Sequence, residues 1–404
     1  MRILETWTAT RLKDICDVIQ YGYTESASTK VIGPKFLRIT DIVPYFVDWD
    51  TVPYCRIDER DYEKYKLHIG DIVIARTGAT TGYNTLIKKD VDAVFASYLI
   101  RFRLNAQKAD FRYIGHLLKS QSYYGFINCA VGGAAQPGIN ATVLSSFSFM
   151  LPHLSTQTRI ANILSTYDNA IENNNRRIAL LEKAARELYR EWFVRMRFPG
   201  YEYTKIIGGL PKGWKVKRLE EFCHVTDGTH DPPKRADSGV PLVTGKCINN
   251  GFIDFNAAYL ISEADHMAIS RRSGLSSGDI LISNIGTVGS ICIVEYNREF
   301  SVKNVIILKP KCMIKSSYLY YLMTSSTMQD TLSAQTNGAS QQFVGLTFMR
   351  RFKILIPNKL ILKCFAEHVS PILKEKQILH TQSQNLARQR DLLLPRLMSG
   401  KLKI

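Results

Sequence analysis

The chain carries two closely similar stretches, GDIVIARTGATTG at Gly70–Gly82 and GDILISNIGTVGS at Gly278–Ser290, whose first residues lie 208 positions apart. Each is an apolar run rich in Ile and Val that passes into Gly and small polar residues, which is typical of a strand entering a tight turn. A strand of this kind needs no second copy. The repetition therefore predicts that a whole domain is duplicated.

Two further pairs of segments keep the same order and nearly the same spacing. WTATRLKDICDV begins at Trp7 and WKVKRLEEFCHV begins at Trp214, and the two agree at Trp, Arg, Leu, Cys and Val. Farther along, GGAAQPGIN at Gly132–Asn140 corresponds to NGASQQFVG at Asn337–Gly345. An apolar segment ending in Leu-Pro or Ile-Pro follows each. We expect a mixed α/β fold, of the α+β type, that occurs twice within the chain.

The region after each copy is predicted to be a long helix, at 153–198 and at 359–404, which leaves mixed, strand-rich domains at 1–152 and 199–358. Apolar residues in both helical regions recur at alternating steps of three and four, as in a coiled coil. Asn174 falls within the first stripe, where it is expected to fix the register. Lys376, Ser383 and Arg390 are expected to interrupt the second stripe. The stripe residues are Leu164, Tyr167, Ile171, Asn174, Ile178, Leu181, Leu188 and Trp192 in the first helix, and Val369, Ile372, Leu379, Leu386, Leu393 and Leu397 in the second.

Each apolar stripe needs a partner. The order domain, helix, domain, helix favours antiparallel packing of the two helices, with the domains at opposite ends. A stripe from Leu164 to Trp192 spans about 42 Å, comparable to one turn of B-DNA. The alternative is that each helix packs only on its own domain.

Composition bounds the class of partner and compartment. Lys and Arg number 53 against 36 acidic residues, a net charge of +17, which favours a polyanion but is shared by ribosomal and membrane-surface proteins. The eight cysteines include no CxxC pair and no zinc-ligand spacing, so they are expected to be reduced and mostly buried. The start, MRILETWTATRLKD, lacks the apolar core of a signal peptide. We expect a cytoplasmic protein.

Catalytic motifs are missing from the sequence. DPPK at Asp231–Lys234 resembles the Asp-Pro-Pro-Tyr signature of adenine methyltransferases, but Lys234 cannot stack on a flipped base as the aromatic residue does. No Gly-rich turn suits a methyl donor or a dinucleotide, and neither GxxxxGK[ST] nor HExxH occurs. His224 and His230 lack the context of metal ligands. A binding or targeting role is therefore favoured over catalysis, and no metal site is predicted.

Over essentially its whole length the sequence resembles the specificity subunit of Type I restriction-modification systems. LPHLSTQTRIANIL, from Leu151, is similar to that family's Leu-Pro-x-Leu-x-x-Gln-x-x-Ile-Ala pattern, with Gln157 as its glutamine. LPKGWKVKRLEEF, TDGTHDPPK and RDLLLPRLMSGKL resemble the family's domain opening, early loop and C-terminal helix end. The chain departs from the pattern at Leu362, which stands where the second copy should have Gln.

The resemblance implies two target recognition domains, each reading one half of a bipartite double-stranded DNA site, with the helices setting the unread spacer. It implies as partners two methyltransferase subunits that use S-adenosylmethionine, and restriction subunits that are driven by ATP and need Mg²⁺. This chain itself would be non-catalytic and hold no cofactor. Two heads joined by a rigid spacer would convert modest half-site contacts into one selective site.

Candidate DNA contacts are polar and aromatic loop residues near the repeated turns. Arg76 corresponds to Asn284, and because Arg favours guanine edges and Asn favours adenine, the two domains are expected to differ in preference. Both could instead cap a turn or reach a phosphate. Gln136 and Gln341 correspond to each other beside the Gly-rich turns. The candidates are Tyr21, Tyr23, Thr24, Ser26, Arg38, Thr40, Arg76, Thr77, Gly78, Thr80 and Gln136 in the first copy, and Asp227, Thr229, His230, Lys234, Lys246, Asn284, Thr287 and Gln341 in the second.

Two other functions remain open on the sequence alone. One is a DNA methyltransferase or nuclease with unfamiliar motifs, which would bind S-adenosylmethionine or act without partners. The other is a coiled-coil scaffold for nucleic acid or an acidic protein, which would show no preference for a bipartite duplex.

Overall fold

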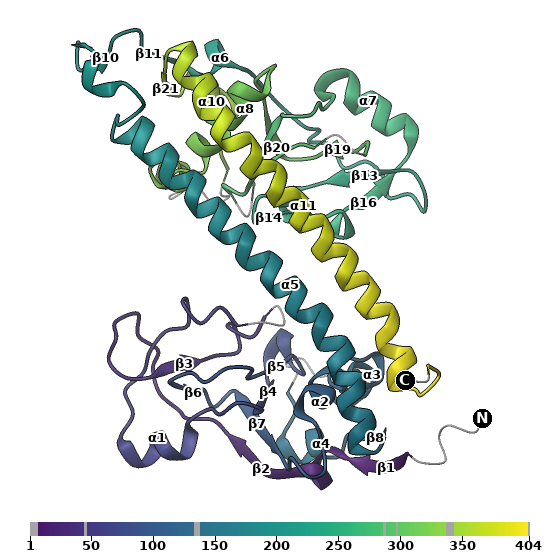
Figure 1. Ribbon diagram of the computed structural model, residues 1–404. Coiled ribbons are helices and arrows are strands. Elements are labelled where there is room, and N and C mark those ends of the chain that lie inside the picture. Colours follow the sequence, from purple (N-terminus) through teal and green to yellow (C-terminus); the bar gives the residue numbers. More distant parts are fainter. Residues whose placement is uncertain are drawn as a thin grey trace. The chain divides into compact units, whose positions relative to one another are not determined.

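The computed structural model describes residues 7–43, 47–132, 138–285, 288–295, 298–336 and 343–402. The chain divides into two compact units (Figure 1). The first unit consists of residues 1–174 and 381–404, and the second of residues 175–380. Each unit therefore combines one strand-rich region with segments of both long helices. Within the described residues no helix is long and apolar enough to cross a membrane.

The first unit is built on a four-stranded antiparallel sheet in the order β2-β7-β4-β5, with a separate parallel pair β3-β6. Strands β1 and β8 pair beside the start of the long helix α5 (Leu154–Tyr189). The elements are β1 (Thr8–Arg11), β2 (Cys16–Tyr21), β3 (Lys35–Leu37), α1 (Glu59–Tyr65), β4 (Ile72–Ala75), β5 (Asn84–Leu86), β6 (Ala93–Phe95), β7 (Leu99–Leu104), α2 (Phe111–Leu117), α3 (Gln121–Val131), α4 (Ala141–Ser145) and β8 (Ser148–Leu151), with 3₁₀ turns at Leu12–Ile15 and Gly78–Thr80.

The second unit repeats this plan with a four-stranded antiparallel sheet in the order β12-β20-β17-β18. The parallel pair is now β13-β19, extended by β16. The elements are β9 (Ile206–Ile207), β10 (Leu210–Pro211), β11 (Lys215–Arg218), α6 (Leu219–Phe222), β12 (His224–Asp227), β13 (Val240–Val243), β14 (Ile248–Asn249), β15 (Phe252–Ile253), β16 (Tyr259–Ile261), α7 (Glu263–Ser273), β17 (Ile280–Ser283), β18 (Ile291–Ile293), β19 (Ser301–Val302), β20 (Val305–Lys309), α8 (Met313–Met323), α9 (Ser326–Thr336), α10 (Leu346–Arg351), β21 (Lys353–Ile356) and α11 (Lys359–Met398). Short 3₁₀ turns lie at Tyr201–Tyr203, Gly245–Cys247 and Phe255–Ala257.

The predicted internal repeat is confirmed at the level of strand pairing. In the first unit Ile74 of β4 pairs with Ile100 of β7, and in the second unit Ile282 of β17 pairs with Ile306 of β20. The separate two-stranded sheets agree as well, because β1 pairs with β8 in the first unit and β11 pairs with β21 in the second. The α+β fold with a duplicated mixed domain therefore follows the sequence expectation.

Burial of β4 on both of its faces explains the continuous apolar run with which the repeat begins. Ile72 and Ile74 belong to the core beneath α2 and α3, whereas Val73 and Ala75 belong to a second core shared with the β3-β6 pair. In the second unit Ile280 and Ile282 lie in one core and Leu281 in another. A strand with polar residues on one face would alternate instead.

The Gly-Asp pair before each of these strands has a structural role. Gly70 and Gly278 have positive φ angles of 93° and 87°, which a Cβ would disfavour. Asp71 is buried and accepts a hydrogen bond from the His68 backbone N–H at 2.9 Å. It also forms an ion pair with Arg103 on β7. Asp279 likewise accepts a hydrogen bond from the Ser276 backbone N–H and forms an ion pair with Lys309 on β20. These carboxylates fix the turn and the strand register.

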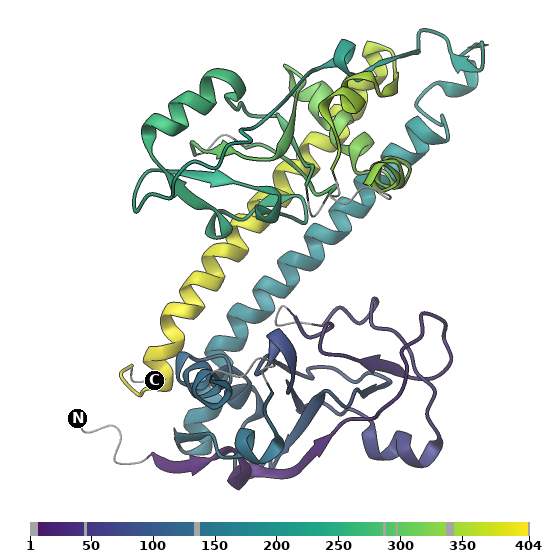
Figure 2. The same cartoon turned by 180° about the vertical axis from the view of Figure 1, so that it is seen from behind.

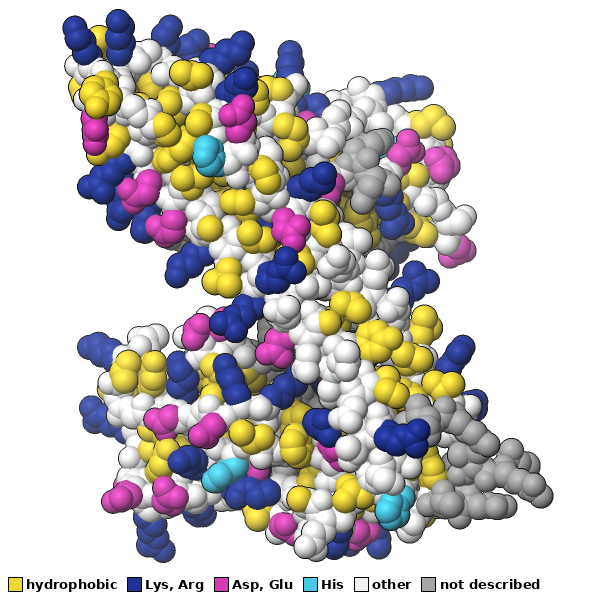
Figure 3. All heavy atoms as spheres, in the orientation of Figure 1, with side chains coloured by type: hydrophobic (Ala, Val, Ile, Leu, Met, Phe, Trp, Pro, Cys, Tyr) yellow, Lys and Arg dark blue, Asp and Glu magenta, His cyan; other side chains and the backbone are white. Residues whose placement is uncertain are grey.

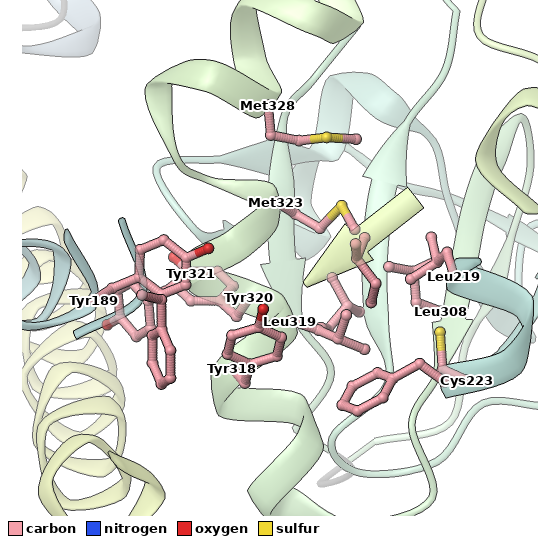
Figure 4. Packing of buried hydrophobic residues seen from close by; sticks show 14 of the residues in the cluster. Tyr189, Leu219, Cys223, Leu308, Tyr318, Leu319, Tyr320, Tyr321, Met323 and Met328 are labelled. Atoms are coloured by element: carbon pink, nitrogen blue, oxygen red, sulfur yellow. The ribbon is translucent and has the colours of Figure 1, made fainter. Parts of the chain in front are cut away.

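The main core of the second unit is rich in aromatic residues that come from distant parts of the chain. Tyr318, Tyr320 and Tyr321 of α8 pack toward Tyr189 at the end of α5 (Figure 4). Beyond Tyr189 the helix continues as one π-helical turn, Arg190–Val194, which contains the buried Trp192. Tyr320 and Tyr321 meet edge to face with ring centres 4.9 Å apart, which adds to the stabilisation that burial alone provides.

Segments of α5 and α11 lie side by side in each unit, in antiparallel order (Figures 1 and 2). In the first unit Leu164 shares a core with Leu394 and Leu397. In the second unit Arg177 pairs with Glu375 at 2.8 Å, and Tyr189 contacts Phe365. Both helices also bury residues against the strand-rich regions, so each helix has two kinds of partner. The predicted antiparallel coiled coil is confirmed as the packing of α5 on α11.

The polar residues of α11 correct one expectation about the helix pair. Lys376 and Ser383 are buried, so they lie within the helix interface rather than interrupting it. Lys376 forms an ion pair with Glu182 of α5, and Arg390 pairs with Asp168 of α5 at 2.6 Å. The interface residues that the apolar pattern indicates fall into two groups. Leu164, Asn174, Trp192, Val369, Leu379 and Leu397 are buried, while Tyr167, Ile171, Ile178, Leu181, Leu188, Ile372, Leu386 and Leu393 are half-buried.

The eight cysteines are all free. Burial raises the pKa of Cys223 to about 12 and, together with the nearby Asp17 carboxylate, raises the pKa of Cys16 to about 12. Both thiols therefore remain protonated at neutral pH, which makes them poor nucleophiles and metal ligands.

A close backbone approach at Gly228 gives a stability prediction. A Cβ at this position would lie 2.1 Å from the carbonyl oxygen of Val302. We expect Gly228→Ala to lower the free energy of unfolding of the second unit by about 1–3 kcal/mol, because backbone atoms must move apart. Gly125→Ala is the matched control, since a Cβ there meets open space on α3 and should be neutral or slightly stabilising. Urea unfolding of both variants checks this, and an unchanged midpoint for Gly228→Ala would contradict it.

Candidate nucleic-acid interface

The ends of β2 and β4, the strands on either side of β7, and the turn before β7 come together in the first unit. Tyr21 is the last residue of β2, and Arg76 directly follows β4. The Arg76 guanidinium carbon lies 5.0 Å from the centre of the Tyr21 ring, and the Arg76 backbone N–H donates to the Tyr98 carbonyl at 3.0 Å. The Tyr21 hydroxyl accepts a hydrogen bond from the backbone N–H of Ala141, at the start of α4. The sequence prediction that Tyr21 and Arg76 belong to one site is consistent with this geometry.

This strand-end cluster has the chemistry of a surface that contacts bases or phosphates. Tyr21 and Tyr98 are 39% and 56% exposed, so their rings are available to a partner. Stacking on Tyr21 holds the flat Arg76 guanidinium in one orientation, which favours two-bond recognition of a guanine edge or a phosphate. Tyr98 was missed by sequence reasoning. The feature that could have indicated Tyr98 is the turn after the apolar strand β6 (Ala93–Phe95). This turn corresponds to the turn after β19 in the second unit.

The second unit uses the same backbone frame with different side chains. The Val344 N–H donates to the Asn284 carbonyl at 3.1 Å, just as the Ile139 N–H donates to the Arg76 carbonyl at 2.8 Å. Asn284, however, is only 1% exposed, and its side-chain oxygen has no hydrogen-bond partner among the described residues. An adenine contact by Asn284 therefore stays a prediction that requires this side chain to become exposed.

Two apolar side chains lie exposed beside Asn284. Ile285 and Phe343, which face each other across an isolated β-bridge, are 38% and 46% exposed. Thr77 and Gly138 form the corresponding bridge in the first unit. Side chains of this kind suit contact with a thymine methyl group. Polarity alone did not single them out in the sequence.

Some residues of the TDGTHDPPK loop are held by hydrogen bonds within the protein, and others are exposed. Asp227 is buried and binds the His230 ring, with 2.7 Å between Nε2 and Oδ2. Thr229 donates to the Asp231 carbonyl at 3.3 Å, whereas Lys234 is exposed. Lys246 is exposed on the 3₁₀ turn Gly245–Cys247.

The other first-unit candidates lie in loops next to the parallel strand pair. Arg38 follows β3 and forms a two-bond ion pair with Asp41, at 2.8 and 3.0 Å, so its guanidinium is held by the protein itself. This pairing raises the pKa of Arg38 further. Tyr23 contacts Tyr65, with ring centres 5.3 Å apart. Exposed positions in these loops and the turn after β4 include Thr24, Ser26, Thr40 and Gly78, while Thr77 and Thr80 are half-buried.

Three predicted residues, Gln136, Thr287 and Gln341, lie outside the described residues. Gln157, the glutamine of the helix-start motif, is buried and serves the first unit internally. Its amide accepts from the Asp110 backbone N–H at 2.9 Å and donates to the Pro152 carbonyl at 2.9 Å. Leu362, which stands at the matching place in the second unit, is buried in its core.

Positive charge is distributed widely over the surface. Lys and Arg side chains occur in many places on the face shown in Figure 3, interspersed with fewer acidic side chains. Such a surface attracts a polyanion without defining a sequence. Within the described ranges no group of three or more His, Cys, Asp or Glu residues could hold a metal ion.

Comparison with known proteins identifies relatives over the full length. A family model described as the Type I restriction modification DNA specificity domain matches residues 4–183 and again residues 211–388. The Type I restriction enzyme MjaIX specificity subunit of Methanocaldococcus jannaschii is 25% identical over 355 residues, covering 83% of this chain and 76% of the relative. The MjaVIII specificity subunit of the same organism is 22% identical over 430 residues, covering 100% and 95%.

A solved structure supports the same architecture. The crystal structure of the Type I restriction-modification S subunit from M. genitalium has a TM-score of 0.58 and 15% sequence identity, and the match covers 97% of this chain and 96% of that chain. At this identity the likeness concerns the fold. The two matches of the family model, together with the duplicated sheets and the paired helices, show that the chain belongs to the family of Type I restriction-modification DNA specificity subunits.

Proposed function

We propose that each unit reads one half of a bipartite double-stranded DNA site, and that this chain directs methyltransferase and restriction subunits to that site. The observation that carries the proposal is the repeated strand-end frame with different side chains. Arg76 and Tyr21 occupy this frame in the first unit, whereas Asn284 and Asp227 occupy it in the second. Equal frames with unequal side chains suit two DNA half-sites of different sequence.

Selectivity arises because two units, each of which binds its DNA half-site weakly, are linked in one chain. A net charge of +17 supplies affinity for phosphates that does not depend on sequence. Each unit then needs only modest base contacts, because binding by one unit raises the effective concentration of the other at its own half-site. The complete site is therefore recognised far better than either half.

We further propose that the chain contributes no catalytic group. Its relatives are named as specificity subunits of restriction enzymes, and its sequence lacks the methyl-donor and nucleotide-binding motifs. Methyl transfer from S-adenosylmethionine would be carried by two methyltransferase subunits, and cleavage that depends on ATP and Mg²⁺ by restriction subunits. A methyltransferase must flip its adenine out of the duplex, so fixed half-site register also positions the reacting base.

The test is to co-express this chain with the methyltransferase subunit encoded beside it and to map methylated adenines on plasmid DNA. We expect a split motif with two specified blocks around a constant unread gap. Replacing residues 1–152 with those of a relative should change one block and leave the other intact. The chain alone, supplied with S-adenosylmethionine, should leave the DNA unmethylated. Methylation at an undivided motif, or methylation by the chain alone, would refute the proposal.

A further inference from the structure

A buried carboxylate in the second unit holds two exposed side chains from different elements. Asp227, the last residue of β12, is 6% exposed. Its Oδ2 lies 2.7 Å from Nε2 of His230, which belongs to the following loop. Its Oδ1 accepts a hydrogen bond from Nη2 of Arg272, near the end of α7 (labelled in Figure 1). One acidic group therefore anchors both.

The Arg272 guanidinium is fixed at one end and open at the other. Nη2 also donates to the Gly228 carbonyl at 2.7 Å, so two acceptors from the same strand end hold it. The side chain is nevertheless 57% exposed, and its Nε and Nη1 have no hydrogen-bond partner within the described part of the chain. A guanidinium held in this way keeps the N–H donors of Nε and Nη1 available to a partner at little further entropic cost.

His230 is held with similar definition. Its Nδ1 lies 3.2 Å from the side-chain oxygen of Asn304, in the turn between β19 and β20, and the ring is 51% exposed. The surroundings carry more positive than negative charge. Exposed Lys234 and Arg235 lie in the loop after β12, Arg271 lies on α7, and half-buried Lys303 lies in the β19-β20 turn, against Asp231 and Asp237.

The position of this group within the repeat connects it to DNA. Asp227 pairs with Ile306 of β20 as Tyr21 pairs with Ile100 of β7, so the two residues occupy equivalent strand ends. Where the first unit places an exposed Tyr beside Arg76, the second places a carboxylate that holds Arg272 and His230. The same edge of the fold is thus equipped with aromatic chemistry in one unit and with anchored cationic chemistry in the other.

We propose that Asp227 is a positioning residue and that Arg272, supported by His230, contacts a backbone phosphate of the half-site that the second unit binds. This rests on the proposed function. A phosphate suits the arrangement because its oxygens accept strong, charge-assisted hydrogen bonds from the N–H groups of a guanidinium that is already fixed. Contacts of this type fix the register of a protein on the duplex and carry no base information themselves.

The experiment measures binding of the complex with its methyltransferase to duplexes at several salt concentrations. Arg272→Ala should weaken binding about 3- to 10-fold and reduce the slope of log K against log salt by roughly one, equally for the mapped site and for a site altered in either half. The methylated motif should stay the same. Arg272→Lys should restore the slope and part of the affinity, because it keeps the charge but loses the planar, fixed arrangement of N–H donors.

The role of Asp227 is tested by coupling. Asp227→Asn should weaken binding less than Arg272→Ala, and the double variant should lose less than the sum of the two single losses, because the carboxylate acts mainly through the arginine. Arg271→Ala is the matched control, since Arg271 is the exposed neighbour on the same helix without the Asp227 anchor. Arg271→Ala should change the affinity by less than about 2-fold, because a surface charge that is not held in place contributes little.

Three outcomes would overturn the inference: an unchanged salt slope in Arg272→Ala, a motif that relaxes at one base pair, or additive losses in the double variant. Failure of the proposed function is distinguishable from these. If the wild-type complex binds duplex DNA without a bipartite preference, the reading of half-sites fails, while the salt slope of Arg272→Ala still reports whether this arginine contacts a phosphate.

Discussion

Replacing Lys376 with Ala should lower the free energy of unfolding of the second unit by about 3–5 kcal/mol. The Lys376 and Glu182 side chains are only 5% and 17% exposed, and they form an ion pair between α11 and α5. Removal of the lysine leaves the largely buried Glu182 carboxylate with only the half-exposed Arg186 and the Tyr321 hydroxyl as partners. Urea unfolding followed by tryptophan fluorescence, to which Trp192 and Trp214 of the second unit contribute, measures the loss.

The exposed pair Arg177–Glu375 joins the same two helices and provides the control. Its side chains are 50% and 41% exposed, so Arg177→Ala should cost less than about 1 kcal/mol. The double variant Glu182→Leu, Lys376→Met should recover most of the loss, because it leaves no buried charge unpaired and Arg186, which then loses Glu182, is 50% exposed. Equal effects of Lys376→Ala and Arg177→Ala would contradict the structural role given to the buried pair.

The same pair links stability to pH. Burial opposes ionisation of Glu182, but Lys376 and Arg186 outweigh it and hold the pKa of this carboxyl below its ordinary value. The contribution of the pair is therefore present above the pKa of an unfolded glutamate and is lost as the pH falls through the lower, folded-state pKa. The difference in stability between wild type and Lys376→Ala should accordingly shrink on titration from neutral pH to about pH 3.

Arg76→Ala is expected to impair recognition of one half-site only. If Arg76 contacts a guanine edge, its loss should cost about 1–3 kcal/mol, a fall of roughly 5- to 150-fold in methylation of the mapped site. The specified block read by the first unit should relax at one position, and the other block should not change. Adenine mapping together with methylation rates on single-base variants of the site gives both readings.

A second arginine of the first unit separates base readout from simple charge. Arg60 is exposed on α1, and Arg60→Ala removes the same charge as Arg76→Ala. Equal, motif-independent weakening by the two variants would show that Arg76 acts through charge or phosphate contact rather than through a base. Tyr21→Leu should reproduce part of the Arg76→Ala effect, because the guanidinium then loses the ring on which it lies.

The duplicated sheets were predictable from the sequence for a physical reason. A strand buried on both faces has to be apolar throughout, and a turn with positive φ favours Gly, so GDIVIA and GDILIS kept their pattern while surface residues diverged. The long helices were predictable because burial along one stripe imposes a period close to that of the helix. These signals are local and repeated, and a single sequence displays them directly.

The polar interior and much of the candidate site were not predictable in this way. Lys376 looked like an interruption because periodicity treats a charged residue as exposed, and only the fold brings Glu182 to it. Asn284 aligned with Arg76, yet its side chain is buried, because equal backbone positions do not impose equal side-chain directions. Arg272 lies on a helix, far in sequence from the loop that its guanidinium contacts.

The division of the chain into units has a consequence for synthesis on the ribosome. Leu394 and Leu397 belong to the same hydrophobic core as Ile114 and Leu164, so the unit that contains the N-terminal region is completed by residues that are translated only after the whole second unit. At about 5–20 residues per second, roughly 10 to 45 s pass between the emergence of Asn174 and that of Leu397. During this interval the apolar side of early α5 lacks its partner. The N-terminal region begins to fold first, but it can close its core only after the second unit has been made.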